Sequence, residues 1–230
     1  MRVFAISDFH LSSVTDKPMD IFGAKWEGHW DKIRAYFEDN VADDDVVLSA
    51  GDTSWGMNLA EAMPDLKKID ELPGKKFIIK GNHDYWWSSY AKINSLGLNT
   101  IRFIQNNAFE AGDYVIAGTR GWTVPSDGEA TAQDKKIFDR EAIRLRLTLE
   151  SAQKLGKDKE IILLMHFPPF DATFADSAFT ETIKNYPVKK VVYGHLHGNR
   201  SRYCASVIKD GVEYLLTSCD FLDFKPLLLY

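Results

Sequence analysis

Five short clusters of histidine, aspartate and asparagine residues occur along the sequence, each directly after a short apolar stretch. The clusters are Asp8-Phe9-His10, Gly51-Asp52, Gly81-Asn82-His83-Asp84, His166 and Gly194-His195-Leu196-His197. They contain five of the six histidines of the chain, and only His29 lies elsewhere. Imidazole nitrogens combined with carboxylate and amide oxygens, without thiolates, suit manganese, iron or zinc better than calcium. The clusters therefore predict a transition-metal site.

The number of potential ligands indicates two metal ions, because a single ion would leave several donors unused. Two pairs of ligands are two positions apart, a spacing that fits an extended segment or a tight turn in which both side chains leave the same face. These pairs are Asp8 with His10 and His195 with His197. One carboxylate can bridge two ions that lie about 3.5 to 4 Å apart. Asp52 stands alone in its cluster, so it is the predicted bridging ligand.

The elements that position these clusters are expected to be short strands alternating with helices. Apolar and β-branched runs predict nine strands, at residues 2–7, 45–50, 75–80, 100–104, 114–118, 160–165, 189–193, 205–208 and 212–217. Strand ends at one edge of a sheet direct their following loops into a shared ligand-binding crevice. Gly51, Gly81 and Gly194 would let the chain turn sharply at this edge. The sequence therefore predicts an α/β fold that brings the clusters together.

Two segments show the apolar periodicity of amphipathic helices. The first has an apolar stripe formed by Trp26, Trp30, Ile33 and Phe37. The second is expected at about residues 134–155, with Phe138, Leu145 and Leu149 inward and with Arg140, Glu141, Arg144 and Arg146 in solvent. Lys209-Asp210-Gly211 joins the last two predicted strands, and this sequence predicts a hairpin with an Asp-Gly turn.

Length and composition limit the class of protein and its partners. The 230 residues are expected to form a single domain, residues 1–230. A balance of 28 basic against 33 acidic residues gives a net charge of −5, which argues against nucleic acid as a partner without excluding it. No apolar run is long enough for a membrane helix, and no secretion signal is visible, so a cytoplasmic protein without a membrane partner is expected. The oligomeric state is left open.

Cysteine usage agrees with that expectation. Cys204 and Cys219 are the two cysteines of the chain. A domain of this size does not need a disulfide for stability, so both thiols are expected to be reduced. Two cysteines also exclude a cysteine-rich zinc site.

Taken together, the five clusters resemble those of the calcineurin-like metallophosphoesterases, in the family's order from Asp8 to His197. The resemblance implies that Asp8, His10 and His197 bind one metal ion, that Asn82, His166 and His195 bind the other, and that Asp52 bridges both. It also implies a four-layer α/β/β/α sandwich of two mixed β-sheets flanked by helices, the metallo-dependent phosphatase fold. A hydroxide between the metals would be the nucleophile.

The pair His83-Asp84 is expected to act in catalysis. The resemblance implies that His83 protonates the leaving group or stabilises charge on the phosphoryl oxygens, and that Asp84 orients it. An adjacent carboxylate would also raise the pKa of an imidazole, which keeps a proton available near neutral pH. General acid catalysis of this kind contributes a factor of about 10² to 10⁴ in rate.

The sequence departs from the family's protein Ser/Thr phosphatases, which carry an aspartate and an arginine soon after the Gly-Asp pair. Here Gly51-Asp52 continues as Thr53-Ser54-Trp55-Gly56-Met57, without that arginine. Arg120, in a glycine-flanked turn after a predicted strand, is a candidate substrate-binding residue because a guanidinium binds phosphate with two hydrogen bonds. An ordinary structural ion pair is the alternative. Arg200 and Arg202 are weaker candidates.

Structural interpretations stand beside several of these assignments. Singly, Asp8 could cap a helix and His166 could be a hydrogen-bonded core histidine; only together do the clusters favour metal. His29 is interpreted as a partly buried histidine and not as a ligand. The tryptophans at 55, 86, 87 and 122 could stack on substrate or fill the core. The loops at residues 11–25 and 123–133 could be substrate lids or exposed connections.

These observations predict a dinuclear metal-dependent phosphoesterase, a hydrolase acting on a small phosphorylated substrate. The cofactors would be two ions of manganese, iron or zinc. The sequence does not decide between a phosphomonoester, a phosphodiester and a pyrophosphate. A nuclease acting on nucleic-acid ends and a non-catalytic metal-binding scaffold remain as alternative functions.

Overall fold

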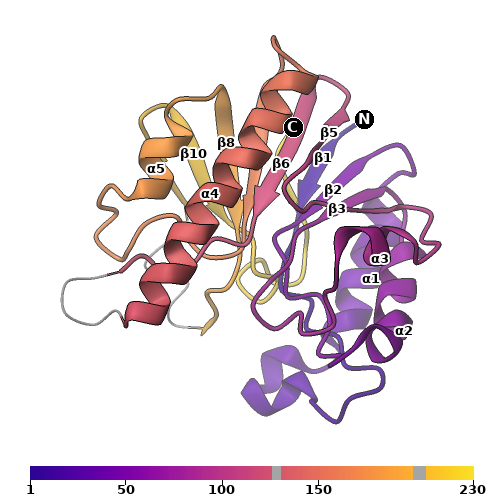
Figure 1. Cartoon of the computed structure of the whole chain (residues 1–230). Helices are drawn as coiled ribbons and strands as arrows, with labels where there is room; N and C mark the ends of the chain where they lie inside the picture. The colour runs from indigo at the N-terminus through magenta and orange to yellow at the C-terminus, as the bar shows by residue number, and fades with distance from the viewer. Residues whose placement is uncertain (126–130, 199–205) are drawn as a thin grey trace. The chain divides into compact units, whose positions relative to one another are not determined.

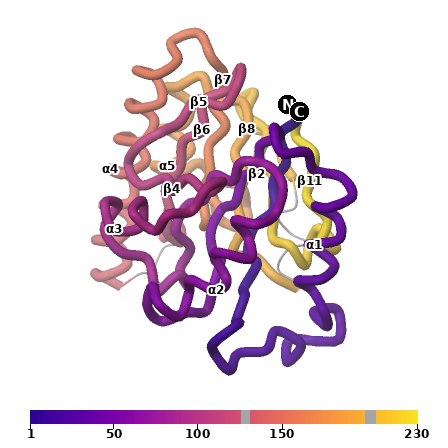
Figure 2. The backbone as a smooth tube through the Cα atoms, turned by 90° about the vertical axis from the view of Figure 1, so that its right-hand side faces the viewer, coloured from indigo at the N-terminus to yellow at the C-terminus, as the bar shows by residue number. Residues whose placement is uncertain are grey.

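The computed structural model describes residues 1–125, 131–198 and 206–230, which fold into two compact units. The first unit contains Met1–Phe103 and Thr217–Tyr230, and the second contains Ile104–Leu216. Figure 2 shows the two ends of the chain side by side in the first unit. Their proximity follows from pairing of the first strand with the last, including a hydrogen bond of 3.0 Å from the Val3 N–H to the Tyr230 carbonyl.

The sheet of the first unit has the strand order β11-β1-β2-β3-β4. Its strands are β1 (Val3–Ala5), β2 (Val46–Ser49), β3 (Lys75–Ile78), β4 (Ile101–Phe103) and β11 (Leu227–Leu228). Neighbours from β1 to β4 are parallel, whereas β11 is antiparallel to β1. The four parallel strands confirm the first four predicted ones; β3 begins where predicted, and every other end lies one or two residues inside the predicted bounds. The two-residue strand β11 was not predicted.

Helices cover one face of this sheet (Figure 1). They are α1 (His29–Asn40), α2 (Leu59–Asp70) and α3 (Tyr90–Asn94), and two short 3-10 helices, η1 (Met19–Phe22) and η2 (Ala24–Trp26), precede α1. Ile33 and Phe37 of α1 are fully buried in the same hydrophobic cluster as strand residues such as Phe4 and Val47. Trp26 of the predicted stripe is also buried, but it lies in η2, because Gly28 has a left-handed backbone (φ 59°) immediately before α1 begins.

The sheet of the second unit has the strand order β5-β6-β7-β8-β10-β9. Its strands are β5 (Ala108–Ala111), β6 (Tyr114–Thr119), β7 (Glu160–Met165), β8 (Val188–Tyr193), β9 (Ser206–Lys209) and β10 (Val212–Leu216). The edge strands β5 and β9 are antiparallel to their neighbours and the others are parallel. Asp210 (φ 52°) and Gly211 (φ 76°) form the predicted hairpin turn, whose positive φ at both residues is typical of a type I′ turn. Strand β5 was not predicted.

Helices α4 (Ala132–Leu155) and α5 (Ala178–Ile183) belong to the second unit, where Phe138 of α4 contacts Phe179 of α5 with ring centroids 4.6 Å apart (Figure 1). Leu145 and Leu149 are fully buried, as predicted. The prediction that Glu141 lies in solvent is wrong, because its carboxylate is fully buried. Periodicity placed Glu141 on the polar face of α4 without showing which charged groups approach that face.

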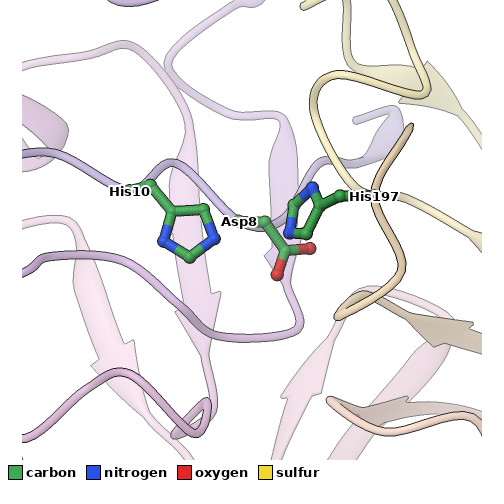
Figure 3. Close-up of side chains that lie close together, drawn as sticks. All are labelled: Asp8, His10 and His197. Atoms are coloured by element: carbon green, nitrogen blue, oxygen red, sulfur yellow. The ribbon is translucent and has the colours of Figure 1, made fainter. Parts of the chain in front are cut away.

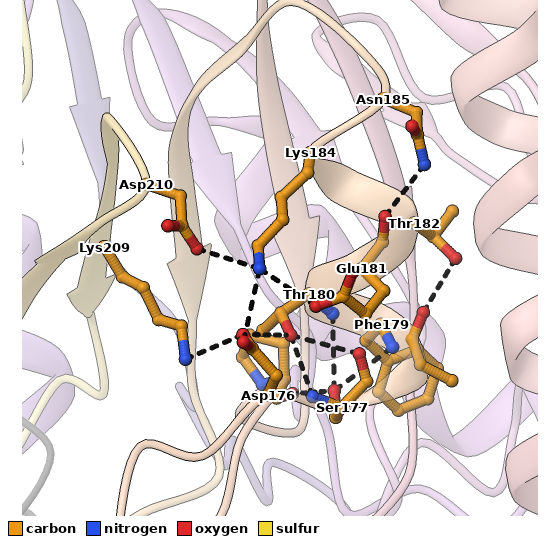
Figure 4. Close-up of polar contacts among 12 residues, drawn as sticks. Asp176, Ser177, Phe179, Thr180, Glu181, Thr182, Lys184, Asn185, Lys209 and Asp210 are labelled. Carbon is orange, nitrogen blue, oxygen red and sulfur yellow. Dashed lines mark hydrogen bonds and ion pairs between the residues drawn. The ribbon is translucent and has the colours of Figure 1, made fainter.

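An ion-pair network fixes α5 to the β9–β10 hairpin (Figure 4). Ser177 caps the helix by accepting hydrogen bonds from the N–H groups of Phe179 and Thr180. The Asp176 carboxylate lies 2.7 Å from the Lys209 ammonium and 3.3 Å from that of Lys184. Hydrogen bonding to Lys209 lowers the pKa of Asp176 to about 2. The network is partly exposed, and it joins residues at both ends of α5 to the hairpin.

The chain thus contains two mixed β-sheets flanked by helices, which is the α/β architecture predicted from the sequence. Within the part of the chain that the structure describes, none of the helices has the length and apolar character needed to cross a lipid bilayer.

Candidate metal centre

The predicted ligands lie in strained turns directly after the strands. Asp8 (φ 60°), His10 (φ 48°), Asp52 (φ 54°) and, in the second unit, His195 (φ 70°) all have left-handed backbones. Few residues other than glycine adopt this conformation, which costs about 1 to 3 kcal/mol at each position and is concentrated in functional sites. The surrounding structure must therefore hold these four side chains in place.

In the first unit, hydrogen bonds between two loops supply that support. The Asp8 N–H donates to the Gly51 carbonyl at 2.9 Å, and the His10 N–H donates to the Asp52 carbonyl at 3.0 Å. The thiol of Cys219 donates to the Asp8 carbonyl at 3.0 Å. The two backbone contacts continue the β1–β2 pairing beyond the sheet, so the clusters that follow the two strands lie side by side.

Two buried carboxylates and an imidazole meet in this region of the first unit. Asp8 is fully buried, Asp52 is 1 % exposed and His10 is 3 % exposed. Ligand atoms of Asp8 lie within 4.8 Å of one on His10 and of one on Asp52 (Figure 3 draws Asp8 and His10). The His10 Nε2 is 3.7 Å from the Asp52 carboxylate. Two ionised carboxylates this close and this deeply buried repel each other unless a cation compensates them, so the oxygen and nitrogen donors fit a metal ion.

Glycine is required at two positions beside Asp52. A Cβ atom on Gly81 would lie 2.1 Å from the Asp52 carboxylate and 2.3 Å from its backbone nitrogen. A Cβ atom on Gly51, which has φ 96°, would lie 2.4 Å from the Gly81 nitrogen. The two glycines predicted to permit sharp turns therefore also let the loops after β2 and β3 touch through their backbones.

The loop after β3 fixes the Asp52 carboxylate. One Asp52 oxygen accepts a hydrogen bond of 2.8 Å from the backbone N–H of His83. The Asn82 and His83 side chains are both partly buried. Asn82, a predicted metal ligand, therefore directly precedes the residue whose backbone is hydrogen-bonded to Asp52.

The Asp84 carboxylate is hydrogen-bonded mainly to backbone N–H groups, and its predicted role in orienting His83 stays a prediction. This fully buried carboxylate accepts hydrogen bonds from the N–H groups of Gly81 (2.7 Å), Asp52 (3.0 Å), Thr53 (2.8 Å) and Ser54 (3.3 Å) and from the Trp86 indole (3.0 Å). Among the described residues, no hydrogen bond joins this carboxylate to the His83 ring, so direct orientation of that ring by Asp84 is not observed. Burial raises the pKa of the Asp84 carboxyl, and the backbone donors oppose that effect. Asp84 joins the loops that follow β2 and β3.

Trp55 lies against two of the predicted functional residues. Its ring is stacked on that of His10, with centroids 4.9 Å apart and an angle of 22°, and its centroid is 4.5 Å from that of His83. Trp86 is buried and donates to Asp84, and Trp87 packs on Phe103. Of the tryptophans in the first unit proposed as substrate contacts, Trp55 is thus at the site, Trp86 is in the core and the partly buried Trp87 packs against that core.

His29 supports the first cluster without being one of the predicted ligands. Its Nε2 donates to the carbonyl of Phe9 at 3.0 Å, between Asp8 and His10. Burial lowers the pKa of His29, which favours the neutral ring. The sequence identified His29 only as a partly buried helix residue, because its contact with Phe9 connects segments that no local pattern relates.

In the second unit, the loops after β7 and β8 bring two predicted ligands together. His166 is fully buried, and its ring centroid is 5.2 Å from that of His195. The His166 carbonyl accepts a hydrogen bond of 3.2 Å from the Gly194 N–H, which joins the two loops. The Phe167 ring packs on His195 at 4.2 Å. His197 follows His195 in the same loop and is partly buried.

Arg120 is engaged with a buried acid of the second unit. Its guanidinium lies 3.5 Å from the Glu141 carboxylate and 4.8 Å from the centroid of the Trp122 ring. Arg140 and Arg144 also contact Glu141, at 3.6 and 2.8 Å. This is the ion-pair alternative considered from the sequence, and phosphate binding by Arg120 stays a prediction. Arg200, Arg202, Cys204 and residues 126–130 of the predicted second loop lie outside the described residues.

Comparisons with known proteins identify relatives of this chain. A family model described as calcineurin-like phosphoesterase matches residues 1–199. No curated protein matches the sequence. Among solved structures, the protein of unknown function AQ665 from Aquifex aeolicus is similar, with 17 % identity, coverage of 99 % of this chain and 95 % of the other, and a TM-score of 0.48. A structure described as a novel archaeal phosphodiesterase has 14 % identity, full coverage of both chains and a TM-score of 0.45.

Proposed function

Since this chain belongs to the calcineurin-like phosphoesterases, a family of metal-dependent hydrolases, we propose that it hydrolyses a phosphoester of a small soluble substrate by means of two metal ions. The observation that carries the proposal is the buried pair Asp8 and Asp52, whose ligand atoms lie within 4.8 Å of each other, next to His10. A structural role for two adjacent buried acids would require a compensating cation, and the donor set is that of a metal site.

We propose that the chain acts as a single catalytic domain with a dinuclear metal centre. Asp8, His10 and His197 would hold one ion, Asn82, His166 and His195 would hold the other, and Asp52 would bridge them. The left-handed backbones of four of these seven residues support this assignment, because strain of this kind persists where a function requires it. Manganese, iron and zinc are the candidate ions.

The chemistry follows from what each group can do. When bound, two cations lower the pKa of a shared water and neutralise charge that develops on phosphoryl oxygens. His83 would donate a proton to the departing oxygen of the ester, because imidazole is the side chain that ordinarily changes protonation near neutral pH. Trp55 packs against the His83 ring and limits the positions it can take. His83 is therefore the proposed catalytic residue, with Asp84 supporting it indirectly through the loops.

The substrate is proposed to be small and soluble, and the protein cytoplasmic. The net charge of −5 disfavours an extended nucleic-acid surface, which makes a nuclease the less favoured alternative.

The test is a panel of phosphomonoester, phosphodiester and pyrophosphate substrates, assayed with the metal-free protein after addition of manganese, iron, zinc or magnesium. We expect turnover of at least one substrate class to depend on a transition metal and to disappear again with a chelator. Absence of turnover with every metal, in folded protein, would contradict the proposal and favour a scaffold.

A further inference from the structure

The loop at residues 11–25 is attached to the site through Trp55. Leu11 donates its N–H to the Thr53 carbonyl at 3.1 Å, and the Trp55 N–H donates to the Leu11 carbonyl at 2.8 Å. Further along the loop, the buried side chain of Met19 accepts a hydrogen bond of 3.3 Å from the Trp55 indole. The loop is thus anchored on both sides of Lys17 to the turn that carries Asp52.

These anchors place the Lys17 side chain over the Trp55 ring. The Lys17 ammonium is 4.5 Å from the centroid of that ring. The same ring contacts His10 and His83, so the ammonium shares one aromatic neighbour with a predicted metal ligand and with the proposed acid. Lys17 therefore brings a positive charge to the edge of the site in the first unit.

The Lys17 charge is available to a ligand. Its side chain is exposed, and among the described residues no carboxylate lies within ion-pair distance of its ammonium. An exposed cation–π contact is weak, about 0.5 to 1 kcal/mol, whereas charge-assisted hydrogen bonds to phosphate are among the stronger polar contacts. The ammonium can therefore move from the ring to a phosphate with a gain in free energy.

Arg120 is a poorer source of that charge. Its guanidinium already pairs with the buried Glu141 carboxylate and lies over the Trp122 ring, so binding a substrate would have to break contacts that the structure makes. The segment after Asp52, where the family's protein phosphatases carry an arginine, has none. A cation that binds phosphate must come from another part of the chain.

We propose that Lys17 binds the anionic oxygens of the phosphorylated substrate, an inference that rests on the proposed function of the site. Lys17 binds the substrate and does not transfer a proton. Its positive charge contributes most to the binding of a dianionic phosphomonoester. The loop at residues 11–25 is therefore a substrate-contacting loop whose specificity comes from one charge.

The test compares Lys17→Met and Lys17→Arg with wild type in the metal-loaded protein. Two measurements are made: steady-state kinetics with p-nitrophenyl phosphate, and calorimetric titration with inorganic phosphate. For Lys17→Met we expect KM and the phosphate Kd to rise about 10-fold, as for loss of a charge-assisted hydrogen bond, with kcat changed less than about threefold. Lys17→Arg keeps the charge and should stay within about threefold of wild type in both measurements.

Lys32→Met is the matched control. The Lys32 ammonium also lies over an aromatic ring, that of Phe224 at 5.1 Å, in the same unit. Unchanged KM and phosphate affinity in Lys17→Met would overturn the inference, and so would an equal effect of Lys32→Met. If wild type shows no turnover with any metal, the proposed function fails, and the phosphate titration still decides whether Lys17 binds the anion.

Discussion

The Asp84 carboxylate accepts a hydrogen bond of 3.0 Å from the backbone N–H of Asp52. This contact joins the loop after β3 to the loop after β2, at the residue proposed to bridge two metal ions. The same carboxylate oxygen accepts from the Gly81 N–H at 2.7 Å. A buried acid that was expected to serve the His83 ring thus holds the backbone on which two predicted ligands are carried.

Asp84→Asn should destabilise this junction. Each Asp84 oxygen accepts from at least two donors, so an amide group in either position leaves buried N–H groups without an acceptor. Loss of an acceptor costs about 1 to 3 kcal/mol per buried donor, and we expect the free energy of unfolding to fall by about 3 kcal/mol. Urea denaturation of the metal-free protein measures the change. Asp171→Asn, in an exposed turn, is the control, and equal stability of both variants would contradict the assigned role.

His83→Ala should separate chemistry from metal binding. The hydrogen bond to Asp52 uses the backbone N–H of His83, which alanine retains, so both metals should stay bound. We expect kcat to fall by about 10² to 10⁴ for esters with a poor leaving group and by much less for nitrophenyl esters. Kinetics across leaving groups of graded pKa, together with metal analysis, test this expectation. A variant with undiminished turnover of poor leaving groups would remove His83 from the mechanism.

Gly81→Ala should disturb the site through one methyl group. The added carbon would lie 2.1 Å from an Asp52 carboxylate oxygen, so the carboxylate or the loop must move. We expect metal affinity to fall by more than about 10-fold, because displaced ligands cannot keep their geometry. Gly97→Ala is the control, since nothing lies near its added carbon and only its positive φ (72°) adds strain. Competition with a chelating dye measures both affinities, and wild-type affinity in Gly81→Ala would be inconsistent with the packing described.

The buried Lys76 should make the free energy of unfolding depend on pH in the alkaline range. It is 1 % exposed in β3, where its ammonium donates to the carbonyls of Asp70 and Leu72, and burial lowers its pKa to about 8. Between pH 8 and about 10.4, the ordinary lysine pKa, the unfolded chain binds more protons than the folded protein. Wild type should therefore gain stability relative to Lys76→Met as the pH rises through this window, by at most about 3 kcal/mol.

Denaturant unfolding at pH 7, 8, 9 and 10 measures the Lys76 effect. Lys75→Met, at the exposed neighbouring position, should follow wild type at every pH. A constant difference between wild type and Lys76→Met over the whole range would show that Lys76 titrates in the folded protein as it does in the unfolded chain.

The positions at which strands end and polar residues follow are predictable from the sequence, because apolar runs and the polar residues after them are local features. The predicted strands that lead into Asp8, Asp52 and His166 are all present, as is the Asp210-Gly211 turn, whose residue types select its backbone. Strand β5 is less predictable, because its pattern of buried and exposed residues extends over only four positions. It is formed as an edge strand by pairing with β6.

Roles that depend on contacts between distant segments were beyond local patterns. Glu141 has a position on α4 that periodicity assigns to solvent, yet it is buried against Thr119, the last residue of β6, and Arg120, which follows that strand. The anchor role of Asp84 and the bond from His29 to Phe9 likewise join loops far apart in the sequence. Residue type shows that these side chains can ionise or form hydrogen bonds. Only the tertiary structure shows which groups each of them contacts.

The measurement that tests the central claim most directly is the number of metal ions bound per folded chain, determined by elemental analysis after reconstitution of metal-free wild type and Asp52→Asn. The proposed set of seven ligands, one of which is the bridging carboxylate of Asp52, predicts two transition-metal ions per wild-type chain and fewer than two for Asp52→Asn. Folded wild-type protein that binds no transition metal, or an Asp52→Asn variant that binds two with unchanged affinity, would contradict the proposed dinuclear centre.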